Sequence, residues 1–235
     1  MLNHYDLSHR SYTSSKNEPT SSFFDFVLSS PAKINLFFKI LFKRPDGYHE
    51  IASLYQAIRL FDYLHFKKAD TFTLTSSDPA LAVDQTNLIT KAVFLFCKHA
   101  GVEPRLHIHL DKNIPMQAGL GGGSGNAATT LFGMNALFNT GISSDKLALW
   151  SAELGSDVPF FFSSGSSYCT GRGEILQDID QLKLPNTVTI VKPDFGLSTQ
   201  LVYSHCKIAD LPHNDPILTL EHIKHGSLDF YNDLE

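Results

Sequence analysis

The chain has 235 residues, of which 43 % are hydrophobic, and a formal net charge of −5. This is enough apolar material for the core of one large domain or two small ones. An acidic chain without a basic patch is not expected to bind nucleic acid, and no apolar run reaches the ~18 residues that a membrane span requires. Cys97, Cys169 and Cys206 form no C-x-x-C pair, which favours buried thiols in a reducing cytoplasm.

Residues 1–22 are rich in Ser, Thr, Asn and His and show no periodic apolar face. Such a composition predicts a disordered extension, because it offers little apolar surface to bury. We therefore expect the folded part of the chain to begin at residue 23.

An apolar run from Phe23 to Phe42 predicts a strand, which residues 29–31 (Ser-Ser-Pro) interrupt. Alternation after the interruption places four side chains on one face: Lys33, Asn35, Phe37 and Lys39. A lysine and an asparagine are costly when they are buried without partners. Two interpretations stay open, a solvent-facing edge or side chains that point into a polar site.

The stretch Arg44–Glu50 contains proline and glycine and predicts a turn, with Tyr48 and His49 directly after the glycine. From sequence alone, an exposed Tyr-His pair is more often incidental than functional. Alternating apolar residues then predict three strands, at residues 51–60, 62–67 and 71–75.

Asn87–Ala100 has apolar residues at helical spacing and is followed by Gly101, so it predicts a helix that ends at a glycine. Arg105–Leu110 alternates strictly and predicts a strand on which His107 and His109 share a face. Paired histidines on such a strand more often face water than hold a metal, so we expect no metal site there.

The highest density of glycine lies in residues 115–130, Pro-Met-Gln-Ala-Gly-Leu-Gly-Gly-Gly-Ser-Gly-Asn-Ala-Ala-Thr-Thr. Five of the seven residues from Gly119 to Gly125 are glycine, which predicts positive φ angles or bare amides that face a ligand. From Asn126 onward, a 3.6-residue apolar period predicts a helix. A glycine loop that enters a helix predicts an anion site, most often for phosphate. A flexible linker or a tight turn is the alternative.

The loop fails to match two common phosphate-binding patterns. A Walker A loop needs Gly-Lys before Ser or Thr, and the chain contains no Gly-Lys pair. The dinucleotide pattern G-x-G-x-x-G fails because Ser124 or Asn126 stands at its third glycine position. The loop must therefore belong to another class.

A second helix is predicted at Ser144–Leu154, with Gly155 as its cap. Asp157 follows, directly before an apolar run at residues 158–162. A carboxylate in this position is either a helix cap or a placed catalytic group, and both interpretations stay open.

The last third of the chain contains weaker patterns. Residues 165–174 predict a glycine-containing turn region, and Thr187–Val191 predicts a buried strand. Residues 194–196 spell Asp-Phe-Gly, the metal motif of protein kinases. We reject that interpretation, because the chain lacks the His-Arg-Asp loop and the strand lysine that accompany the motif.

Three separated stretches together resemble one known family: Pro31–Leu36 with the Gly-Tyr-His turn at 47–49, the glycine loop, and Leu154–Phe160. The segment 231–235 matches a fourth family stretch. In this order they resemble the galactokinase, homoserine kinase, mevalonate kinase and phosphomevalonate kinase (GHMP) superfamily. Within it they are most similar to the branch that phosphorylates a cytidine diphosphate sugar alcohol in the non-mevalonate isoprenoid pathway. The resemblance runs from about Leu28 to the C-terminus.

This resemblance implies an α+β fold of two domains. Residues 23–183 would form an ATP-binding domain, like domain 2 of ribosomal protein S5 and with a left-handed β-α-β unit. Residues 184–235 would form part of a ferredoxin-like substrate domain. The implied activity is a cytoplasmic kinase that uses ATP and Mg²⁺ on a small-molecule alcohol, without nucleic acid or membrane as a partner.

The resemblance also implies catalytic and substrate-binding roles, carried over by position. Asp157 would accept the proton of the substrate hydroxyl, and Lys33 would orient that hydroxyl and stabilise the alkoxide. The remaining substrate contacts form a set of four, one beside the catalytic pair and three around the cytosine ring: Asn35, Tyr48, His49 and Phe195.

For the nucleotide, the resemblance implies contacts near the adenine from Asn87 and Lys112, and it implies that Ser124 assists with phosphate or Mg²⁺. The loop itself would hold the phosphates through its backbone amides. Its implied residues are Pro115, Met116, Gln117, Ala118, Gly119, Leu120, Gly121, Gly122, Gly123, Ser124 and Gly125.

The chain departs from the family pattern at Gln117 and Gly125, where the family usually has Gly and Ser. It also contains no late Gly-Ser/Thr-Gly segment, the family's third motif, which closes over the nucleotide. The resemblance therefore allows an incomplete sequence or an inactive, nucleotide-binding remnant. A homoserine- or mevalonate-type kinase is the alternative within the superfamily.

Overall fold

The computed structural model describes residues 23–180, 182, 184–193, 196 and 199–234. The predicted disordered extension at residues 1–22 and the predicted ring-binding residue Phe195 lie outside this part of the chain. The described residues form a mixed sheet with helices packed on it, which confirms the predicted α+β class.

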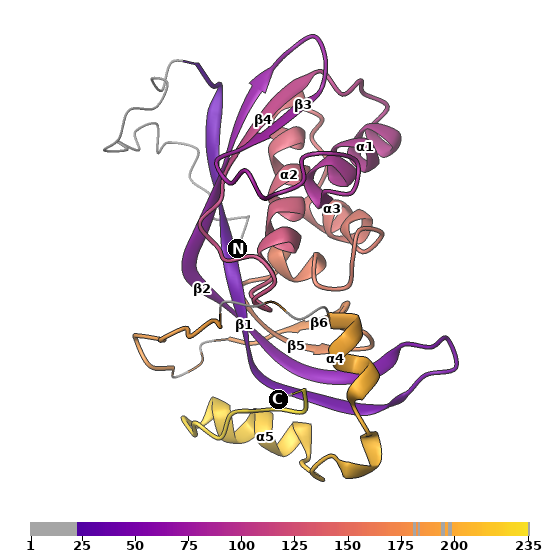
Figure 1. Cartoon of the computed structure of the whole chain (residues 1–235), viewed down its shortest axis with the longest axis vertical. Helices are drawn as coiled ribbons and strands as arrows, with labels where there is room; N and C mark the ends of the chain where they lie inside the picture. Colours follow the sequence, from indigo (N-terminus) through magenta and orange to yellow (C-terminus); the bar gives the residue numbers. More distant parts are fainter. Residues whose placement is uncertain (1–22, 181, 183, 194–195, 197–198, 235) are drawn as a thin grey trace.

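Two long antiparallel strands, β1 (Phe26–Lys43) and β2 (His49–Lys68), run from one end of the molecule to the other (Figure 1). The sheet order is β3 (Thr73–Ser76), β4 (Leu106–Asp111), β2, β1 and β7 (Tyr231–Asn232). β4 pairs with one half of β2, and β5 (Ser166–Thr170) pairs with the other half. The two long strands therefore connect both halves of the molecule.

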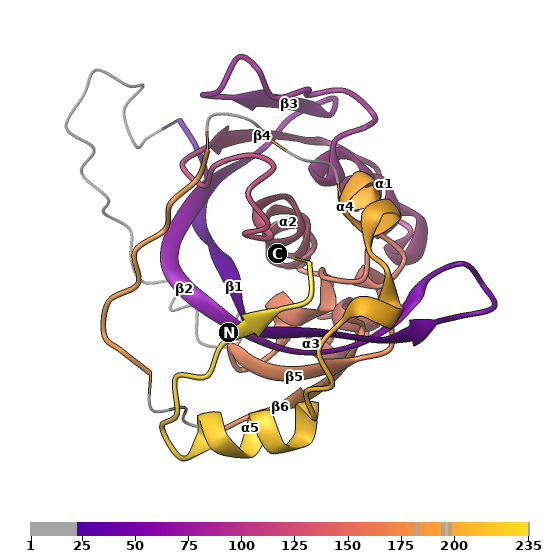
Figure 2. The same cartoon turned by 60° about the horizontal axis from the view of Figure 1, so that its bottom comes forward.

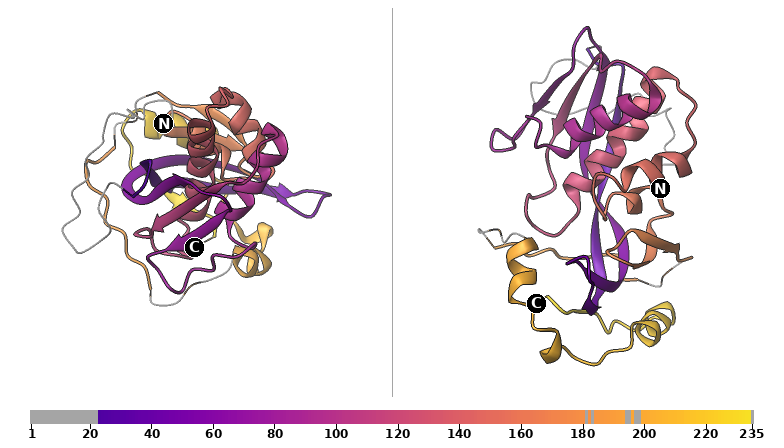
Figure 3. Two further views of the ribbon diagram at one scale, coloured as in Figure 1. Left: turned by 90° about the horizontal axis from the view of Figure 1, so that it is seen from above. Right: turned by 90° about the vertical axis from the view of Figure 1, so that its right-hand side faces the viewer.

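Three helices cover one face of the sheet in the first half: α1 (Leu88–Ala100), α2 (Gly122–Phe138) and α3 (Ser144–Ser151) (Figure 3). α1 confirms its prediction, with Asn87 as N-cap and Gly101 in the left-handed conformation at its end. α2 is the central helix, and its apolar residues pack on those of β2 and β4. β3, α1 and β4 form a β-α-β unit whose two strands are parallel neighbours.

Two predicted helix limits were wrong. α2 begins at Gly122, not at Asn126, because Gly121 in the left-handed conformation (φ 66°) lets the helix start inside the glycine loop. α3 ends at Ser151, not at Leu154, because residues 153 and 154 donate to carbonyls three residues back, which tightens the last turn. A short 3₁₀ helix, η2 (Pro159–Phe162), follows Asp157.

The sequence predicts a break in each of the two long strands, but both strands continue there and form a β-bulge. The pairing shifts register between Pro31 and Ala32, where β2 carries two extra residues, 59 and 60. The predicted interruption at residues 29–31 and the predicted division of β2 into two strands were therefore wrong. A bulge bends a strand pair without ending it, which sequence alternation does not reveal.

A second register shift lies between Asn35 and Phe37. Because side chains alternate along a strand, one extra residue moves all later side chains to the opposite face. The prediction of one shared face was therefore wrong. Lys33 and Asn35 lie on the face that carries α1, α2 and α3. Phe37 and Lys39 lie on the other face, where Lys39 Nζ is 3.2 Å from a carboxylate oxygen of Asp233.

The second half of the molecule holds the hairpin of β5 and β6 (Ile175–Asp178) and the helices α4 (Thr199–His205) and α5 (Pro216–Lys224), with the short η3 (Ile208–Asp210) between them. Of the predicted turn region at 165–174, residues 166–170 form β5, and residues 171–174 form the turn of the hairpin, with Gly171 and Gly173 at positive φ. α5 packs on the face of the sheet opposite to the one that α1, α2 and α3 cover. β7 lies beside β1, although the two strands are far apart in the sequence (Figure 2). The division into domains at residue 183 stays a prediction.

The predicted buried strand at Thr187–Val191 does not form. Val191 is 87 % exposed, and no strand of the described chain pairs with this segment. Apolar, β-branched residues favour a strand only where a neighbouring strand and a packing surface exist. Of the three free cysteines, Cys169 is buried as predicted, whereas Cys97 and Cys206 are partly exposed. No helix in the described residues has the length and apolar character needed to cross a membrane.

Candidate active site

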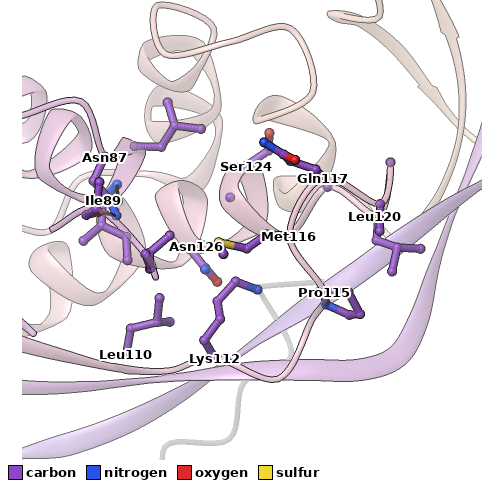
Figure 4. A pocket seen from close by; sticks show the side chains of 18 of the residues that line it. Asn87, Ile89, Leu110, Lys112, Pro115, Met116, Gln117, Leu120, Ser124 and Asn126 are labelled. Carbon is purple, nitrogen blue, oxygen red and sulfur yellow. Dashed lines mark hydrogen bonds between the residues drawn. The ribbon is translucent and has the colours of Figure 1, made fainter. Parts of the chain in front are cut away.

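The glycine loop lines a cavity of about 400 Å³ between β4, α1 and α2 (Figure 4). The cavity holds all but one of the predicted nucleotide-binding residues: Asn87, Lys112 and residues 115–124. Gly125 lies outside the lining, because it is buried against β1, where a Cβ would come within 2.8 Å of the Pro31 carbonyl oxygen. The remaining lining comes mainly from residues 81–89.

The start of α2 has the features that the sequence predicts for an anion site. Gly119 and Gly121 have φ angles of 68° and 66°, which confirms the predicted positive torsions, and Gln117 also has a positive φ of 53°. The first N–H groups of a helix have no carbonyl partner within that helix. The amides at the start of α2, together with the positive end of the helix dipole, therefore face the cavity without an intrahelical partner.

A buried carboxylate, Asp62 on β2, fixes the base of this loop. Its Oδ1 accepts from the backbone amides of Asn113 and Ile114, both at 2.7 Å. Its Oδ2 accepts from Lys112 Nζ and Asn126 Nδ2, both at 2.9 Å. Asp62 is fully buried, so these four donors compensate its loss of hydration. The carboxylate thus ties the end of β4 to the first turns of α2.

A second polar centre lies on the same face of the sheet, where Lys33 of β1 meets Asp157. Lys33 Nζ is 3.6 Å from Asp157 Oδ2, and the lysine side chain is 6 % exposed while that of Asp157 is 36 % exposed. Lys33 therefore points into a polar site, and the interpretation of a solvent-facing edge was wrong for this residue. The side chain of Asp157 accepts no capping hydrogen bond from the backbone of η2; it accepts from Tyr55 Oη at 3.2 Å instead.

Asn35 orients Lys33 through a chain of hydrogen bonds. Lys33 Nζ donates to Asn35 Oδ1 at 2.7 Å, and Asn35 Nδ2 donates to Ser53 Oγ at 2.9 Å. Ser53 is fully buried, and its hydroxyl donates to the Phe37 carbonyl at 2.6 Å, so its oxygen is left to accept from the amide. This chain turns the amide oxygen of Asn35 towards the lysine.

The loop and the polar centre touch at Gly121. A Cβ at this position would lie 2.8 Å from Lys33 Cγ and 3.1 Å from Phe161 Cζ. Because Gly121 has no side chain, the Lys33 side chain can lie directly beside the start of α2. The two parts are adjacent, with the N-terminal end of α2 next to a lysine–carboxylate pair.

Tyr48 lies in the turn between β1 and β2, and His49 is the first residue of β2. Tyr48 is 55 % exposed, and the guanidinium of Arg172 lies 4.8 Å from the centre of its ring. His49 stacks on Tyr203 of α4 with ring centres 4.9 Å apart. Burial, followed by the charge of Asp157, raises the pKa of Tyr203 to about 12. An aromatic group from the second half of the chain thus contacts a predicted substrate residue.

Sequence reasoning missed four residues of this site: Tyr55, Asp62, Arg172 and Tyr203. Asp62 had one usable signal, since a carboxylate between Phe61 and Tyr63 in an apolar strand requires partners if it is buried. Tyr55, Arg172 and Tyr203 had none, because tyrosine in a strand and arginine in a turn are ordinary. Their contacts depend on pairing between distant segments.

The histidines of β4 lie on the outer face of the sheet. Thr75 Oγ1 lies 3.0 Å from His107 Nε2 and 2.8 Å from His109 Nδ1. His65 of β2 and His109 both contact Asp111, at 2.7 and 3.2 Å. Hydrogen bonds from these two histidines hold the pKa of Asp111 well below its usual range, although burial acts in the opposite direction. Among the described residues, no group of three potential ligands is arranged to hold a metal ion.

We expect His107 to make the stability of the fold sensitive to mild acid. Burial, and then the charges of His109 and Lys67, lower the pKa of His107 below its ordinary value of 6.5. The folded state therefore binds fewer protons at this site than the unfolded state. The resulting stability is complete above pH 6.5 and is lost as the pH falls from there through the folded pKa.

Melting temperatures measured from pH 7.5 down to 5.0 test this expectation. His107→Gln should reduce the fall in melting temperature below pH 6.5, whereas the exposed control His222→Gln should leave the fall unchanged. Equal pH dependence of the wild type and His107→Gln would contradict it.

Comparisons with known proteins agree with this geometry. Residues 87–165 match the GHMP kinases N terminal domain. The 4-diphosphocytidyl-2-C-methyl-D-erythritol kinase of Protochlamydia amoebophila (strain UWE25) is 46 % identical over 218 residues, which cover 93 % of this chain and 74 % of that protein. The chloroplastic kinase of the same name from Oryza sativa subsp. japonica is 42 % identical over 215 residues, and the chain spans 54 % of its length.

A solved structure shows the same relation. The crystal structure of a 4-(cytidine 5'-diphospho)-2C-methyl-D-erythritol kinase superposes with a TM-score of 0.72 at 30 % sequence identity, covering 89 % of this chain and 76 % of that one. The predicted GHMP kinase fold is thereby confirmed. With this fold, and with 46 % identity to a relative of which it covers 74 %, the chain belongs to the 4-diphosphocytidyl-2-C-methyl-D-erythritol kinase family of GHMP kinases.

Proposed function

We propose that the chain catalyses the ATP-dependent phosphorylation of the 2-hydroxyl of 4-diphosphocytidyl-2-C-methyl-D-erythritol, a step of the non-mevalonate isoprenoid pathway. The observation that carries the proposal is the close approach at Gly121, which places the buried Lys33 and its partly exposed partner Asp157 beside the start of α2. Phosphoryl transfer needs positioned charge, a base and little else from the protein. The site provides these elements in one place.

In this proposal, the oxygen of the substrate hydroxyl forms a bond to the γ-phosphorus of ATP, and Asp157 accepts the proton that this hydroxyl loses. The bond from that phosphorus to the bridging oxygen breaks, and ADP leaves. Lys33 lies 3.6 Å from the carboxylate and stabilises the developing alkoxide. Asn35 accepts a hydrogen bond from the lysine and keeps it in this position, and Asn35 is proposed to contact the substrate as well.

The glycine loop is proposed to hold the ATP phosphates through the amides at the start of α2, with the adenine near Asn87. Lys112 is one of the residues that line the cavity, and its ammonium pairs with Asp62 and donates to the Ile114 carbonyl, which fixes the loop. Mg²⁺ fits this site, since it needs only one or two protein oxygens besides phosphate, and the Ser124 hydroxyl lines the cavity. When bound, Mg²⁺ neutralises charge on the phosphates.

The proposed acceptor is distinguished from homoserine and mevalonate by its cytosine ring. Tyr48 exposes an aromatic face at the hairpin end, which supports stacking with a base. An assay of ADP release with ATP, Mg²⁺ and each of the three acceptors tests the proposal. Turnover with 4-diphosphocytidyl-2-C-methyl-D-erythritol alone would support it. Preference for another acceptor would contradict the substrate, and ATP binding without turnover on any acceptor would favour an inactive remnant.

The role of His49 gives a further test of the substrate. We expect His49→Ala to weaken binding of the cytidine substrate by about 10-fold or more, because stacking is worth ~1–3 kcal/mol per base and a lost hydrogen bond adds to this. The variant should leave ATP affinity unchanged, since His49 is not part of the cavity lining. Calorimetric titration with each ligand measures both. Equal weakening of both ligands, or of neither, would remove His49 from the substrate site.

A matched pair of glycine variants tests the contact between the two parts of the site. Gly119 and Gly121 have nearly the same positive φ, so alanine at either position carries similar backbone strain of ~1–2 kcal/mol. The Cβ that alanine would add at position 121 would collide with the Lys33 side chain. At position 119, no atom of the described residues lies within 4 Å of the added Cβ. We expect Gly121→Ala to lower kcat ~10- to 100-fold more than Gly119→Ala, because displaced catalytic groups cost about this much. Equal kcat values would show that the contact is unimportant.

A further inference from the structure

Tyr55 lies on β2 directly beneath the lysine–carboxylate pair. It is 2 % exposed, and its ring packs edge-on against Phe160 of η2 with centres 5.4 Å apart. Its hydroxyl reaches Asp157 Oδ1 at 3.2 Å, and Lys33 Nζ lies 4.2 Å from the centre of its ring. One buried side chain therefore contacts both members of the pair with different parts of its structure.

The hydroxyl of Tyr55 can act only as a donor towards the carboxylate. Burial, followed by the charge of Asp157, raises the pKa of Tyr55 well above its usual value. The phenol therefore keeps its proton throughout the working range of an enzyme. Because Oδ1 of Asp157 accepts this hydrogen bond, the carboxylate is held with Oδ2 towards Lys33.

The ring of Tyr55 supports the lysine from below. A cation over an aromatic face is attracted by the ring, and more strongly when water is excluded, as it is around the 6 % exposed Lys33 side chain. Asn35 holds the same ammonium from the side. Room for the hydroxyl comes from Gly173, where a Cβ would lie 2.8 Å from Tyr55 Oη.

We propose that Tyr55 is a positioning residue for phosphoryl transfer, which holds Oδ1 of Asp157 so that Oδ2 accepts the substrate proton beside Lys33. This inference rests on the proposed function for the identity of the reaction. The orientation of the carboxylate by Tyr55 can be measured without turnover.

The variant Tyr55→Phe removes the donor and keeps the ring, so packing and the cation–aromatic contact remain. We expect kcat to fall ~10- to 100-fold, the effect of one hydrogen bond to a charged group. ATP affinity and melting temperature should stay near the wild-type values. The acid limb of the pH–rate profile should move to higher pH, because a carboxylate that loses a donor takes up a proton more readily.

Two controls separate positioning from general packing. Tyr168→Phe removes a hydroxyl from β5, on the other face of the sheet, and should change kcat less than twofold. In the Asp157→Asn background, Tyr55→Phe should cause no further loss, since the two residues act as one unit. An unchanged kcat and pH profile in Tyr55→Phe, or an equal loss in the Asp157→Asn background, would overturn the inference.

A direct readout covers the case in which the wild-type chain shows no turnover, which would contradict the proposed function but not this inference. NMR titration of the Asp157 side-chain carboxyl carbon should give a midpoint at higher pH in Tyr55→Phe than in the wild type. The Tyr168→Phe control should leave the midpoint unchanged. Identical midpoints in the wild type and Tyr55→Phe would overturn the inference whatever the activity.

Discussion

Replacing Asp157 by asparagine is expected to lower kcat by ~10²- to 10⁴-fold, the contribution of a general base. Asparagine has the same shape but cannot take a proton at neutral pH. ATP affinity should hardly change, because Asp157 lies outside the cavity formed by the glycine loop. Melting temperature should also change little, since the side chain is 36 % exposed and does not cap η2.

Kinetics and calorimetry on one preparation check this expectation. A double variant adds a further criterion: Lys33→Ala on top of Asp157→Asn should cost little more, since residues that act as a unit are not additive. If Asp157→Asn kept near-normal turnover and melted earlier, Asp157 would be a structural residue and the base would lie elsewhere.

The second large effect concerns stability. Asp62→Asn is expected to lower the free energy of unfolding by ~3–5 kcal/mol, because one partner of a buried ion pair is removed. Whichever way the new amide is turned, its NH₂ group faces two of the four donors that Asp62 accepts. The Lys112 ammonium, 6 % exposed, is left without a counter-charge. ATP affinity should fall as well, because the base of the loop loses its anchor.

Urea denaturation of three variants measures this effect. Glu221→Gln removes one partner of an exposed pair, Glu221–Lys224, and should cost less than about 1 kcal/mol. Lys112→Met added to Asp62→Asn should restore part of the lost stability, because it removes the unpaired buried charge. A loss from Asp62→Asn no larger than that of the surface control would show that the carboxylate does not hold the loop.

The sequence alone determined the local features of this protein. Asn87 and Gly101 mark the ends of α1 because capping depends on residues within one turn of the helix end. The glycine cluster at 119–125 predicted positive φ angles or bare amides, and Gly119 and Gly121 do have positive φ. That the loop binds an anion stays a prediction. These patterns depend on neighbours in the chain, so the chain itself reveals them.

The arrangement of the strands was decided by tertiary structure. The bulge between Asn35 and Phe37 sends Lys39 to the opposite face from Lys33, although both follow the same alternation in sequence. The apolar segment at residues 187–191 forms no strand, because the described chain provides no strand to pair with it. Register and pairing depend on two segments at once, and one pattern cannot specify them.

The same holds for the polar network of the site. Asp62 receives donors from residues 50 or more positions away, and Tyr55 reaches Asp157 across 102 positions. The motifs pointed to Lys33, Asp157 and the glycine loop through their resemblance to a family. Of the buried groups that hold them, Tyr55 looks like an ordinary strand residue in sequence, and Asp62 signals only that a buried carboxylate needs partners, not which ones. Burial gave them their function, because a group removed from water must find its partners within the fold.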